Sequence, residues 1–227
     1  MHKFLVALSL FLISSSLYAS DSTRVAAPKP PRVRSIDIGV APTSYVKGDL
    51  NPQVKLWTST FHIGYSFMRA KRVNGHLHFF AGSVSGQNPD VQYSDKAGTS
   101  NSNVYFHTSL IGLNYDLRIH IIKRKQYGVY FSQGIGLLRF SPRDTEKNSL
   151  QDQLNTRALG ESYNNISLQL PTGFGAYYTL PQGFGLGFQA TRLNQTTDYI
   201  DNISTLSTFS KADRVVYYQI YCIVPIH

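Results

Sequence analysis

The sequence predicts an all-β fold, an eight-stranded antiparallel up-and-down transmembrane β-barrel. Eight segments alternate bulky apolar residues with small or polar ones, which is the period of a β-strand whose two faces meet different surroundings. The connections between these segments are alternately long and short along the chain. After a short apolar start, no segment is apolar over the length that a membrane-spanning helix needs, so a barrel is the remaining way to cross a lipid bilayer.

The first 19 residues have the three parts of a secretory signal peptide. Lys3 supplies a positive charge, residues 4–13 form an apolar core, and Ala19 ends a small-residue processing site. The apolar core is interrupted at Ser14, well short of the roughly twenty residues of a membrane anchor. We therefore expect a signal peptide at 1–19, a proline-rich periplasmic leader at 20–31 and the barrel at 32–227, located in the bacterial outer membrane.

Composition limits which partners the protein can bind and which interactions can stabilise its fold. The chain has 22 Lys and Arg against 13 Asp and Glu, a formal net charge of +9. This balance can indicate nucleic-acid binding, but export argues against that partner. Cys222 is the single cysteine, so no internal disulfide can form and the fold must be held by strand pairing and burial. We expect Cys222 to act as a small apolar residue on a strand.

The strands are expected in order along the chain. The first begins at Val33, sets Ile36 and Ile38 against Asp37, and ends before Pro42. The others are expected at 54–68, 76–85, in two runs within 104–140, and at 163–178, 184–191 and 214–226.

The segment 104–140 shows the clearest alternation, two long runs joined by a tight basic turn. In its first run Leu113 and Tyr115 share one face, whereas Asn114, Asp116 and Arg118 share the other. One face is bulky and apolar and the other is small or polar. The segment is therefore predicted to be a membrane-spanning β-hairpin.

Two strands depart from a clean alternation. In the third, Phe79 and Phe80 are adjacent, which leaves open the face taken by His76 and His78. In the sixth, Pro171 lacks a ladder donor, so we expect a local irregularity there.

The lengths of the connections predict the orientation. The long ones lie at 43–52, 86–103, 141–162 and 194–213, and the short ones lie at 71–75, 123–125 and 180–183. In 71–75 the pair Asn74-Gly75 is a favoured hairpin turn. Outer-membrane barrels have short periplasmic turns and longer external loops, so the four long connections are expected outside and both chain ends in the periplasm.

A secreted soluble barrel or sandwich is the main alternative, and side-chain size argues against it. Side chains fill the interior of an eight-stranded barrel, and the apolar face of this chain is too bulky to fit there. The opposite face is largely Gly, Ser and Thr, whereas the exterior of a soluble barrel would carry many Lys and Glu. The bulky face contains Trp57, Phe61, Phe67, Tyr115, Phe131, Phe174, Phe184 and Phe188.

This arrangement resembles the small eight-stranded outer-membrane β-barrel proteins of Gram-negative bacteria, the class that includes OmpX, the OmpA membrane domain and OmpW. The resemblance covers nearly the whole mature chain and is architectural, since no loop or catalytic motif matches a particular member. The family commonly ends in an aromatic residue that the assembly machinery reads. Here the chain ends at Pro225, Ile226 and His227, a departure that bears on insertion.

Charged residues on the small-residue face are expected to form a polar network in the lumen. An unpaired charge in a narrow lumen is costly, so Arg118 is expected to pair with Asp116 or Asp37 across strands, with His120 nearby. We favour a structural plug, and a proton or ion path is the alternative.

Basic residues gather at the predicted periplasmic end, where they could contact anionic headgroups of outer-membrane lipids or simply be solvated. The two basic turns contain Arg69, Lys71 and Arg72, and Lys123, Arg124 and Lys125. The long loops are instead rich in Asp and Glu, but no calcium-loop spacing occurs, so we expect no metal and no cofactor.

Glycines form a band of small residues on the predicted lumenal face, which favours close packing over a lateral cavity for an acyl chain or a small solute. The band contains Gly128, Gly134, Gly136, Gly173, Gly175, Gly185 and Gly187.

The sequence offers no catalytic arrangement within a strand. His62 and Ser66 share a face, as do Asp116 and His120, but four residues along a strand span roughly 13 Å, beyond hydrogen-bond reach. We therefore expect a non-enzymatic protein with a structural or surface-interaction role carried by its external loops. A narrow channel for small or hydrophobic solutes is the first alternative, and a lipid-modifying enzyme is the second.

Overall fold

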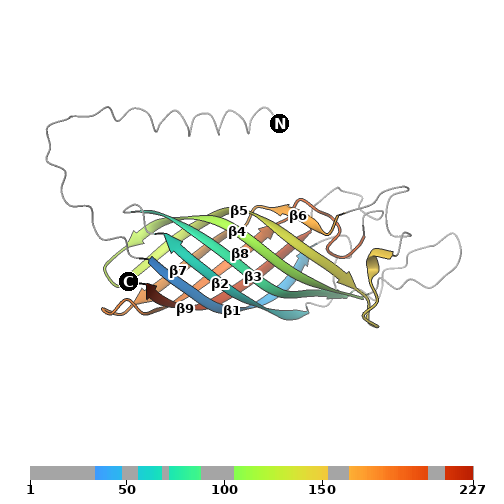
Figure 1. Cartoon of the computed structure of the whole chain (residues 1–227), viewed down its shortest axis with the longest axis horizontal. Helices are drawn as coiled ribbons and strands as arrows, with labels where there is room; N and C mark the ends of the chain where they lie inside the picture. The colour runs from blue at the N-terminus through green and yellow to red at the C-terminus, as the bar shows by residue number, and fades with distance from the viewer. Residues whose placement is uncertain are drawn as a thin grey trace, which may run out of the picture. The chain divides into compact units, whose positions relative to one another are not determined.

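The computed structural model describes residues 34–47, 56–67, 72–87, 105–152, 164–203 and 213–226. The expected signal peptide and leader lie outside these residues. Arg32–His227 forms one compact unit, and its described part is a β-barrel (Figure 1).

The barrel is a closed antiparallel meander in which the first and last strands pair with each other. Eight strand positions follow one another around it, and this confirms the predicted fold class. One position is shared by two short strands, β6 and β7. The strands are β1 (Arg34–Lys47), β2 (Trp57–Phe67), β3 (Val73–Gln87), β4 (Tyr105–Lys123), β5 (Tyr127–Arg143), β6 (Ile166–Gln169), β7 (Thr172–Thr179), β8 (Gly185–Asn194) and β9 (Arg214–Ile226).

The interruption between β6 and β7 lies at Pro171, where the sequence predicted an irregularity. Both strands pair with β5, and the register is the same on either side of the gap, with Gln133↔Thr172 before it and Gly136↔Gln169 after it. The missing amide proton of the proline therefore interrupts the hydrogen-bond ladder without shifting the strand.

Helical structure is minor. A single 3-10 turn, η2 (Leu150–Asp152), follows β5. No helix in the described ranges is long and apolar enough to span a membrane.

Exposure alternates residue by residue along the strands, as β4 illustrates. Leu113 and Tyr115 are 50% and 47% exposed, whereas Asn114 and Asp116 are 1% and 3% exposed. The outward face of the barrel is apolar over several strands, far beyond the apolar patches of ordinary soluble proteins. Such a surface is matched by lipid, so the barrel is a transmembrane one. Large outward side chains include Trp57, Phe61, Leu137, Phe174, Phe184, Leu186, Phe188 and Ile220.

Strand β1 extends further than predicted, into the expected loop 43–52. Pro42 keeps its pairing with Ser59 of β2, while the pairing with β9 is interrupted and resumes in register at Thr43↔Tyr217. The proline removes a donor on one side of the strand and does not end it. The loops expected at 86–103, 141–162 and 194–213 also begin slightly later, because β3, β5 and β8 run to Gln87, Arg143 and Asn194.

The prediction of a hairpin turn at Asn74-Gly75 is wrong. Both residues belong to β3, and Gly75 pairs with Phe67 of β2. Asn74 is buried in the lumen, and a Cβ on Gly75 would lie 2.6 Å from the hydroxyl of Tyr115 on the next strand. A glycine is therefore needed where the Tyr115 side chain approaches the backbone of Gly75. Because β2 ends at Phe67 and β3 begins at Val73, the connection between them falls earlier than predicted.

The two ends of the barrel differ. The turn end carries the short connections around 68–72, 124–126 and 180–184, together with the start of β1 and the end of β9. Gly183, with φ of +93°, allows the tight turn between β7 and β8. The loop end carries the four long connections. The alternation of long and short connections is thus present in space as well as along the chain.

The lumen holds larger side chains than the sequence predicted. Its glycines lie beneath aromatic rings of neighbouring strands: a Cβ on Gly175 would be 2.3 Å from Tyr130, and one on Gly187 would be 2.2 Å from Tyr221. The glycines therefore make room for rings that fill the lumen, which agrees with the packing interpretation of the glycine band.

Candidate functional site

The lumen near the turn end contains a buried ion pair between Arg118 of β4 and Asp37 of β1. Arg118 Nη1 lies 2.9 Å from Asp37 Oδ2, and both residues are buried. Arg118 also donates to the hydroxyl of Ser66 at 3.4 Å and to Oε1 of Gln189 at 3.3 Å. Because β1 and β4 are not neighbours in the sheet, this pair crosses the lumen. Of the two partners expected for Arg118, the structure places Asp37 against it.

Two tyrosine rings complete the enclosure of Arg118. The guanidinium carbon lies 4.9 Å from the ring centre of Tyr130 and 5.7 Å from that of Tyr221, within the range of cation–π contact. The Tyr130 hydroxyl donates to Gln189 at 2.6 Å and lies 2.9 Å from the hydroxyl of Tyr221. The charge is therefore compensated by a carboxylate, an amide and two π-faces, as a buried cation requires.

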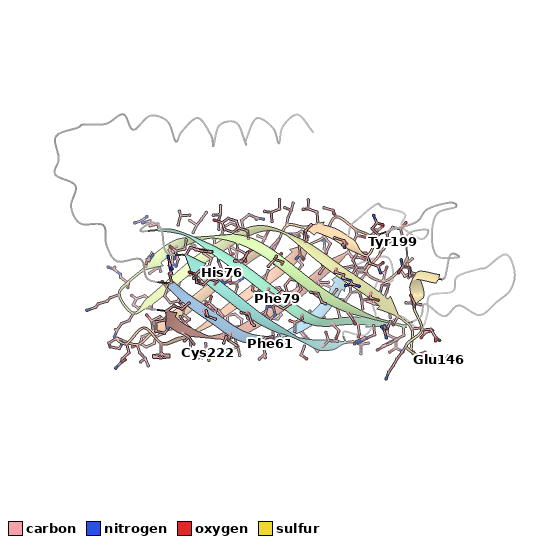
Figure 2. The ribbon with its side chains drawn as sticks, viewed as in Figure 1. Phe61, His76, Phe79, Glu146, Tyr199 and Cys222 are labelled. Carbon is pink, nitrogen blue, oxygen red and sulfur yellow. The ribbon has the colours of Figure 1, made fainter. Side chains whose placement is uncertain are left out.

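His76 bridges two buried carboxylates. Its Nε2 lies 3.1 Å from Asp37 Oδ2, and its Nδ1 lies 3.5 Å from Asp116 Oδ2. His78 approaches the same Asp116 oxygen at 3.9 Å. The structure places Asp116 with these histidines rather than with Arg118. Both histidine side chains lie in the lumen, and this answers which face of the strand they take, a point that the sequence left open. His76 is labelled in Figure 2.

The inward position of His76 and His78 follows from the alternation along β3, which the two adjacent phenylalanines make visible. Phe79 is 39% exposed and points outward, whereas Phe80 is 1% exposed and points inward. Both side chains thus obey the alternation, one against lipid and one in the core. The pair was ambiguous in the sequence because two apolar neighbours fit either face equally well.

A further chain of polar contacts continues from His78 toward the loop end. His62 Nδ1 lies 2.9 Å from His78 Nε2, His62 Nε2 lies 2.7 Å from Thr60 Oγ1, and Thr60 Oγ1 lies 2.8 Å from Thr43 Oγ1. All four residues are buried. Strand alternation alone puts His62 and Thr60 on one face of β2, but it gives no sign that they would join His78, which lies on the next strand.

His120 lies apart from this network. Its Nδ1 is 3.3 Å from the backbone carbonyl of Arg72, near the turn end. The pairs His62 with Ser66 and Asp116 with His120 make no hydrogen bond in the described part, and Ser66 instead contacts Arg118. The lumenal histidines and hydroxyls therefore stabilise the interior and do not form the two pairs considered from the sequence.

One serine–histidine contact was not anticipated. Ser85 of β3 and His107 of β4 lie directly opposite each other, with Ser85 Oγ 2.8 Å from His107 Nδ1. Strand alternation puts them on the side opposite the inward residues Val84 and Phe106, near the loop end, yet Ser85 is only 4% exposed. Spacing along one strand could not reveal the pair, because it forms across two strands.

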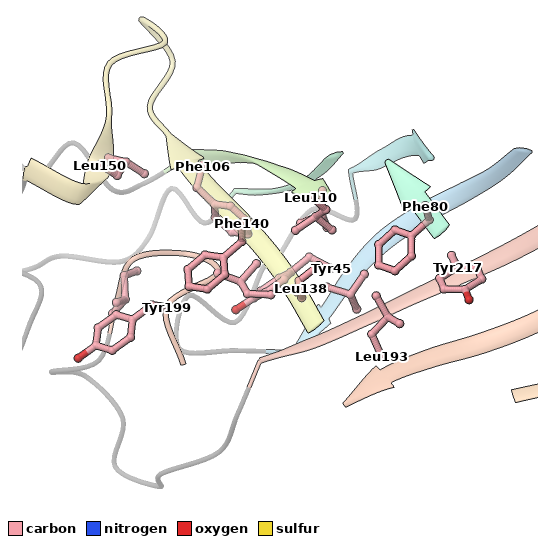
Figure 3. Packing of buried hydrophobic residues seen from close by; sticks show 14 of the residues in the cluster. Tyr45, Phe80, Phe106, Leu110, Leu138, Phe140, Leu150, Leu193, Tyr199 and Tyr217 are labelled. Atoms are coloured by element: carbon pink, nitrogen blue, oxygen red, sulfur yellow. The ribbon is translucent and has the colours of Figure 1, made fainter. Parts of the chain in front are cut away.

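A hydrophobic cluster closes the lumen at the loop end (Figure 3). The segment after β8 folds over the opening, where Ile200 and Ile203 are fully buried, and the carbonyl of Ile200 accepts a hydrogen bond from Thr108 at 2.5 Å. Leu150 of η2 packs into the same cluster. Its largest members also include Tyr45, Phe80, Phe106, Leu110, Leu138, Phe140, Leu193, Tyr199 and Tyr217.

Two aspartates anchor this closing segment. The Tyr45 hydroxyl lies 2.8 Å from Asp201 Oδ2 and 2.6 Å from Asp213 Oδ1. The backbone amide of Ile200 donates to Asp213 at 2.7 Å, and that of Ile203 donates to Asp201 at 3.0 Å. Burial, followed by the nearby carboxylate of Asp201, raises the pKa of Asp213 well above its ordinary value. Asp213 is therefore more easily protonated than an ordinary aspartate.

The turn end of the lumen opens into a cavity of about 260 Å³. Its walls include Asp37, Arg118 and His120, and its rim includes the turn Lys123, Arg124 and Lys125 between β4 and β5.

The predicted basic turns are described in part. Arg69 and Lys71 lie outside the described residues, and Arg72 is exposed. Lys123, Arg124 and Lys125 lie at the turn end. Among the described residues, no group of three His, Cys, Asp or Glu side chains is placed to hold a metal ion.

The closed barrel, its apolar exterior and its filled lumen define the class of the protein: it is a small eight-stranded transmembrane β-barrel of the outer-membrane kind. No protein-family model matches the chain, and no curated protein matches it. Solved structures do match it in fold, at low identity.

Three of these structures give the extent of the match in fold. Ail, the attachment invasion locus protein of Yersinia pestis, was solved in complex with the heparin analogue sucrose octasulfate and matches at 13% identity and a TM-score of 0.49, covering 87% of this chain and 100% of its own. Neisserial surface protein A matches at 13% identity and 0.48, covering 84% and 96%. The outer membrane enzyme PagL matches at 14% identity and 0.35, covering 85% and 99%.

Proposed function

We propose that this chain is a non-conducting, non-enzymatic protein of the bacterial outer membrane, a rigid barrel that presents its four long loops at the cell surface. The observation that carries the proposal is the closed lumen. Arg118, Asp37 and His76 occupy the lumen toward its turn end, and the cluster around Ile200 and Ile203 covers its loop end. A barrel filled in this way serves as an anchor, and its loops are the part free to contact other molecules.

The proposed topology has the turn end in the periplasm and the loop end outside. Three short turns, the start of β1 and the end of β9 share the turn end, as in outer-membrane barrels. Residues 1–19 would direct export and be removed. The basic residues at the turn end would face phospholipid headgroups of the inner leaflet.

Planar-bilayer recording of the refolded protein tests the non-conducting lumen. We expect no discrete conductance steps from samples whose folding is verified by heat-modifiable gel mobility. As a control, the Ile200→Asp/Ile203→Asp variant removes the apolar cover but leaves the Arg118 network, and it should still conduct little. Regular steps from the unaltered protein would contradict the proposal and support the channel alternative.

The enzyme alternative has one specific observation in its favour, the contact between Ser85 and His107. A nucleophile and base within hydrogen-bond reach is the start of an acyl-transfer site. Ser85, the nucleophile of this pair, is nevertheless buried. In the described part no carboxylate contacts His107, so a cross-strand structural hydrogen bond is the favoured interpretation.

Lipid analysis of cells that overexpress the protein separates these two interpretations. We expect unchanged acylation of lipid A and phospholipids. A change in acylation that the Ser85→Ala variant abolishes, and that the matched Ser83→Ala variant on the same face of β3 retains, would replace the anchor proposal with an enzymatic one.

A further inference from the structure

The cavity at the turn end is assembled from strands far apart in the sequence. Asp37 of β1, Asn74 of β3, Arg118 of β4, Tyr130 of β5 and Tyr221 of β9 all contribute to its wall. These side chains are only 1% to 6% exposed, so the packing of the surrounding residues holds them in place. The cavity therefore has a preformed wall with a few fixed polar groups, as binding sites for small molecules usually do.

The charge of the cavity is strongly positive. Its lining includes four cationic side chains and one carboxylate, Asp37. That carboxylate is already engaged by Arg118 at 2.9 Å and by His76 at 3.1 Å. In the described part of the chain, no carboxylate pairs with the rim residues Lys123, Arg124 and Lys125. Three positive charges thus meet at one opening, and the described residues supply no counter-ion for them.

Polar atoms in the wall also lack partners. Arg118 Nε is a buried donor that makes no hydrogen bond within the described residues, and Arg118 is 6% exposed. A buried guanidinium normally uses most of its donors, because leaving one unpaired costs free energy. Within the described residues, this donor of Arg118 is left unused.

We propose that this cavity binds a phosphate group. A phosphate carries enough charge and acceptor oxygens to engage several cationic side chains at once, which a single carboxylate does less well. A volume of about 260 Å³ accepts one phosphate group with a short substituent but not a whole lipid. The group would enter from the turn end, either as the headgroup of a membrane phospholipid or as a small soluble phosphate compound.

Equilibrium dialysis with labelled inorganic phosphate tests the site, using the full mature chain in nanodiscs of zwitterionic phosphatidylcholine. We expect saturable binding that is weakened about tenfold in the Lys123→Gln/Arg124→Gln/Lys125→Gln variant, since each partly exposed charge contributes a fraction of the roughly 1.4 kcal/mol that a tenfold change requires. The matched control is Arg72→Gln, an exposed cation at the same end that does not line the cavity, and it should bind normally.

A second arm distinguishes the two sources of phosphate. Native mass spectrometry in mixed phosphatidylcholine and phosphatidylglycerol detects lipid that stays bound to the protein. Retention of phosphatidylglycerol by the unaltered chain and its loss in the triple variant would assign the site to a headgroup, and displacement of labelled phosphate by that lipid would agree. Binding of phosphate without lipid retention would assign it to a soluble compound.

The proposal is overturned if neither phosphate nor phosphatidylglycerol binds, or if the triple variant and Arg72→Gln bind both as well as the unaltered chain does. Arg124 and Lys125 lie in an exposed turn and Lys123 is half-buried at the end of β4, so the triple variant is expected to fold; unchanged heat-modifiable mobility verifies this.

Discussion

Arg118 shows how this barrel places a full charge in a narrow interior. Its guanidinium is bound by Asp37 and Gln189 and lies against two tyrosine rings, all from strands other than its own. Removing one member of such a pair leaves the other charge buried and uncompensated, which is the costly outcome.

We therefore predict that Arg118→Ala lowers the free energy of unfolding by about 3 to 5 kcal/mol, the usual cost of breaking a buried pair. The double variant Arg118→Met/Asp37→Asn should recover much of this loss, because it removes both charges. Thermal unfolding in detergent micelles, followed by heat-modifiable gel mobility, measures both effects. A midpoint in Arg118→Ala equal to that of the unaltered chain would contradict a structural role for the pair.

Asp213 gives the second prediction at the residue scale. Its pKa is raised by burial and by Asp201, and Asp198 and the Tyr45 hydroxyl also face it. A carboxyl whose pKa is raised in the folded state contributes stability that is full below its ordinary pKa and is lost as the pH rises through the raised value. The docked closing segment should accordingly be less stable at alkaline pH.

The Asp213→Asn variant should show a flatter dependence of the thermal midpoint on pH, because the amide cannot ionise. It should also be destabilised at acidic pH by about 1 to 3 kcal/mol, because both oxygens of Asp213 accept hydrogen bonds, from Tyr45 and from the amide of Ile200, and an amide nitrogen cannot accept one. The exposed Glu146, labelled in Figure 2, provides the control: Glu146→Gln should keep the original pH profile. Identical profiles for all three proteins would show that folding does not change the pKa of Asp213, and would contradict the prediction.

At the scale of the strand, glycines on one strand make room for aromatic rings of the neighbouring strand. Gly175 of β7 lies under the Tyr130 ring of β5, so the ring can lie flat across the neighbouring strand. The barrel interior is filled by this arrangement on several strands.

The variant Gly175→Ala should lower stability by about 1 to 3 kcal/mol, the usual cost of overpacking, because its Cβ would lie 2.3 Å from the Tyr130 ring. The neighbouring outward residue supplies the control, since Ala176→Leu adds apolar surface toward lipid and should be tolerated. Urea unfolding in lipid vesicles compares the two. Equal stability of Gly175→Ala and the unaltered chain would mean that the ring is free to move aside.

Strand-level features were predictable where they depended on local pattern. The break at Pro171 and the outward position of Tyr115 follow from donor loss and alternation alone. The end of β1 and the turn at Asn74-Gly75 were not predictable, because a proline can be tolerated on one side of a ladder and a glycine can serve ring packing instead of a turn. Pairing with neighbouring strands decides both cases.

At the scale of the whole molecule, the apolar outer surface determines where the barrel can reside. Ile135, at the middle of β5, is 53% exposed, and Leu180, in the turn before β8, is 51% exposed. Because the two side chains are similarly exposed but lie at different heights along the barrel, substitutions at the two positions show how the cost of a charge depends on depth in the bilayer.

We predict that Ile135→Arg costs about 2 to 4 kcal/mol and lowers folding yield into lipid vesicles, whereas Leu180→Arg costs about 0 to 1 kcal/mol, because the cost of a charge falls from the bilayer midplane to its edge. Folding yield and urea unfolding in the same vesicles measure the difference. Equal, small effects at both positions, together with a protein that stays in water without detergent, would contradict the transmembrane barrel.

The sequence by itself determined the fold class, the order of the strands and the face of nearly every strand residue, because side chains alternate with a period of two and the two faces met different surroundings. Only the tertiary structure decided which lumenal groups meet. Arg118 and Asp37 lie on strands that are not neighbours, His62 and His78 lie on different strands, and the closing segment joins Asp213 to Tyr45 across the chain. Such contacts depend on the stagger of the strands and on closure of the barrel, and a local period carries no information about either.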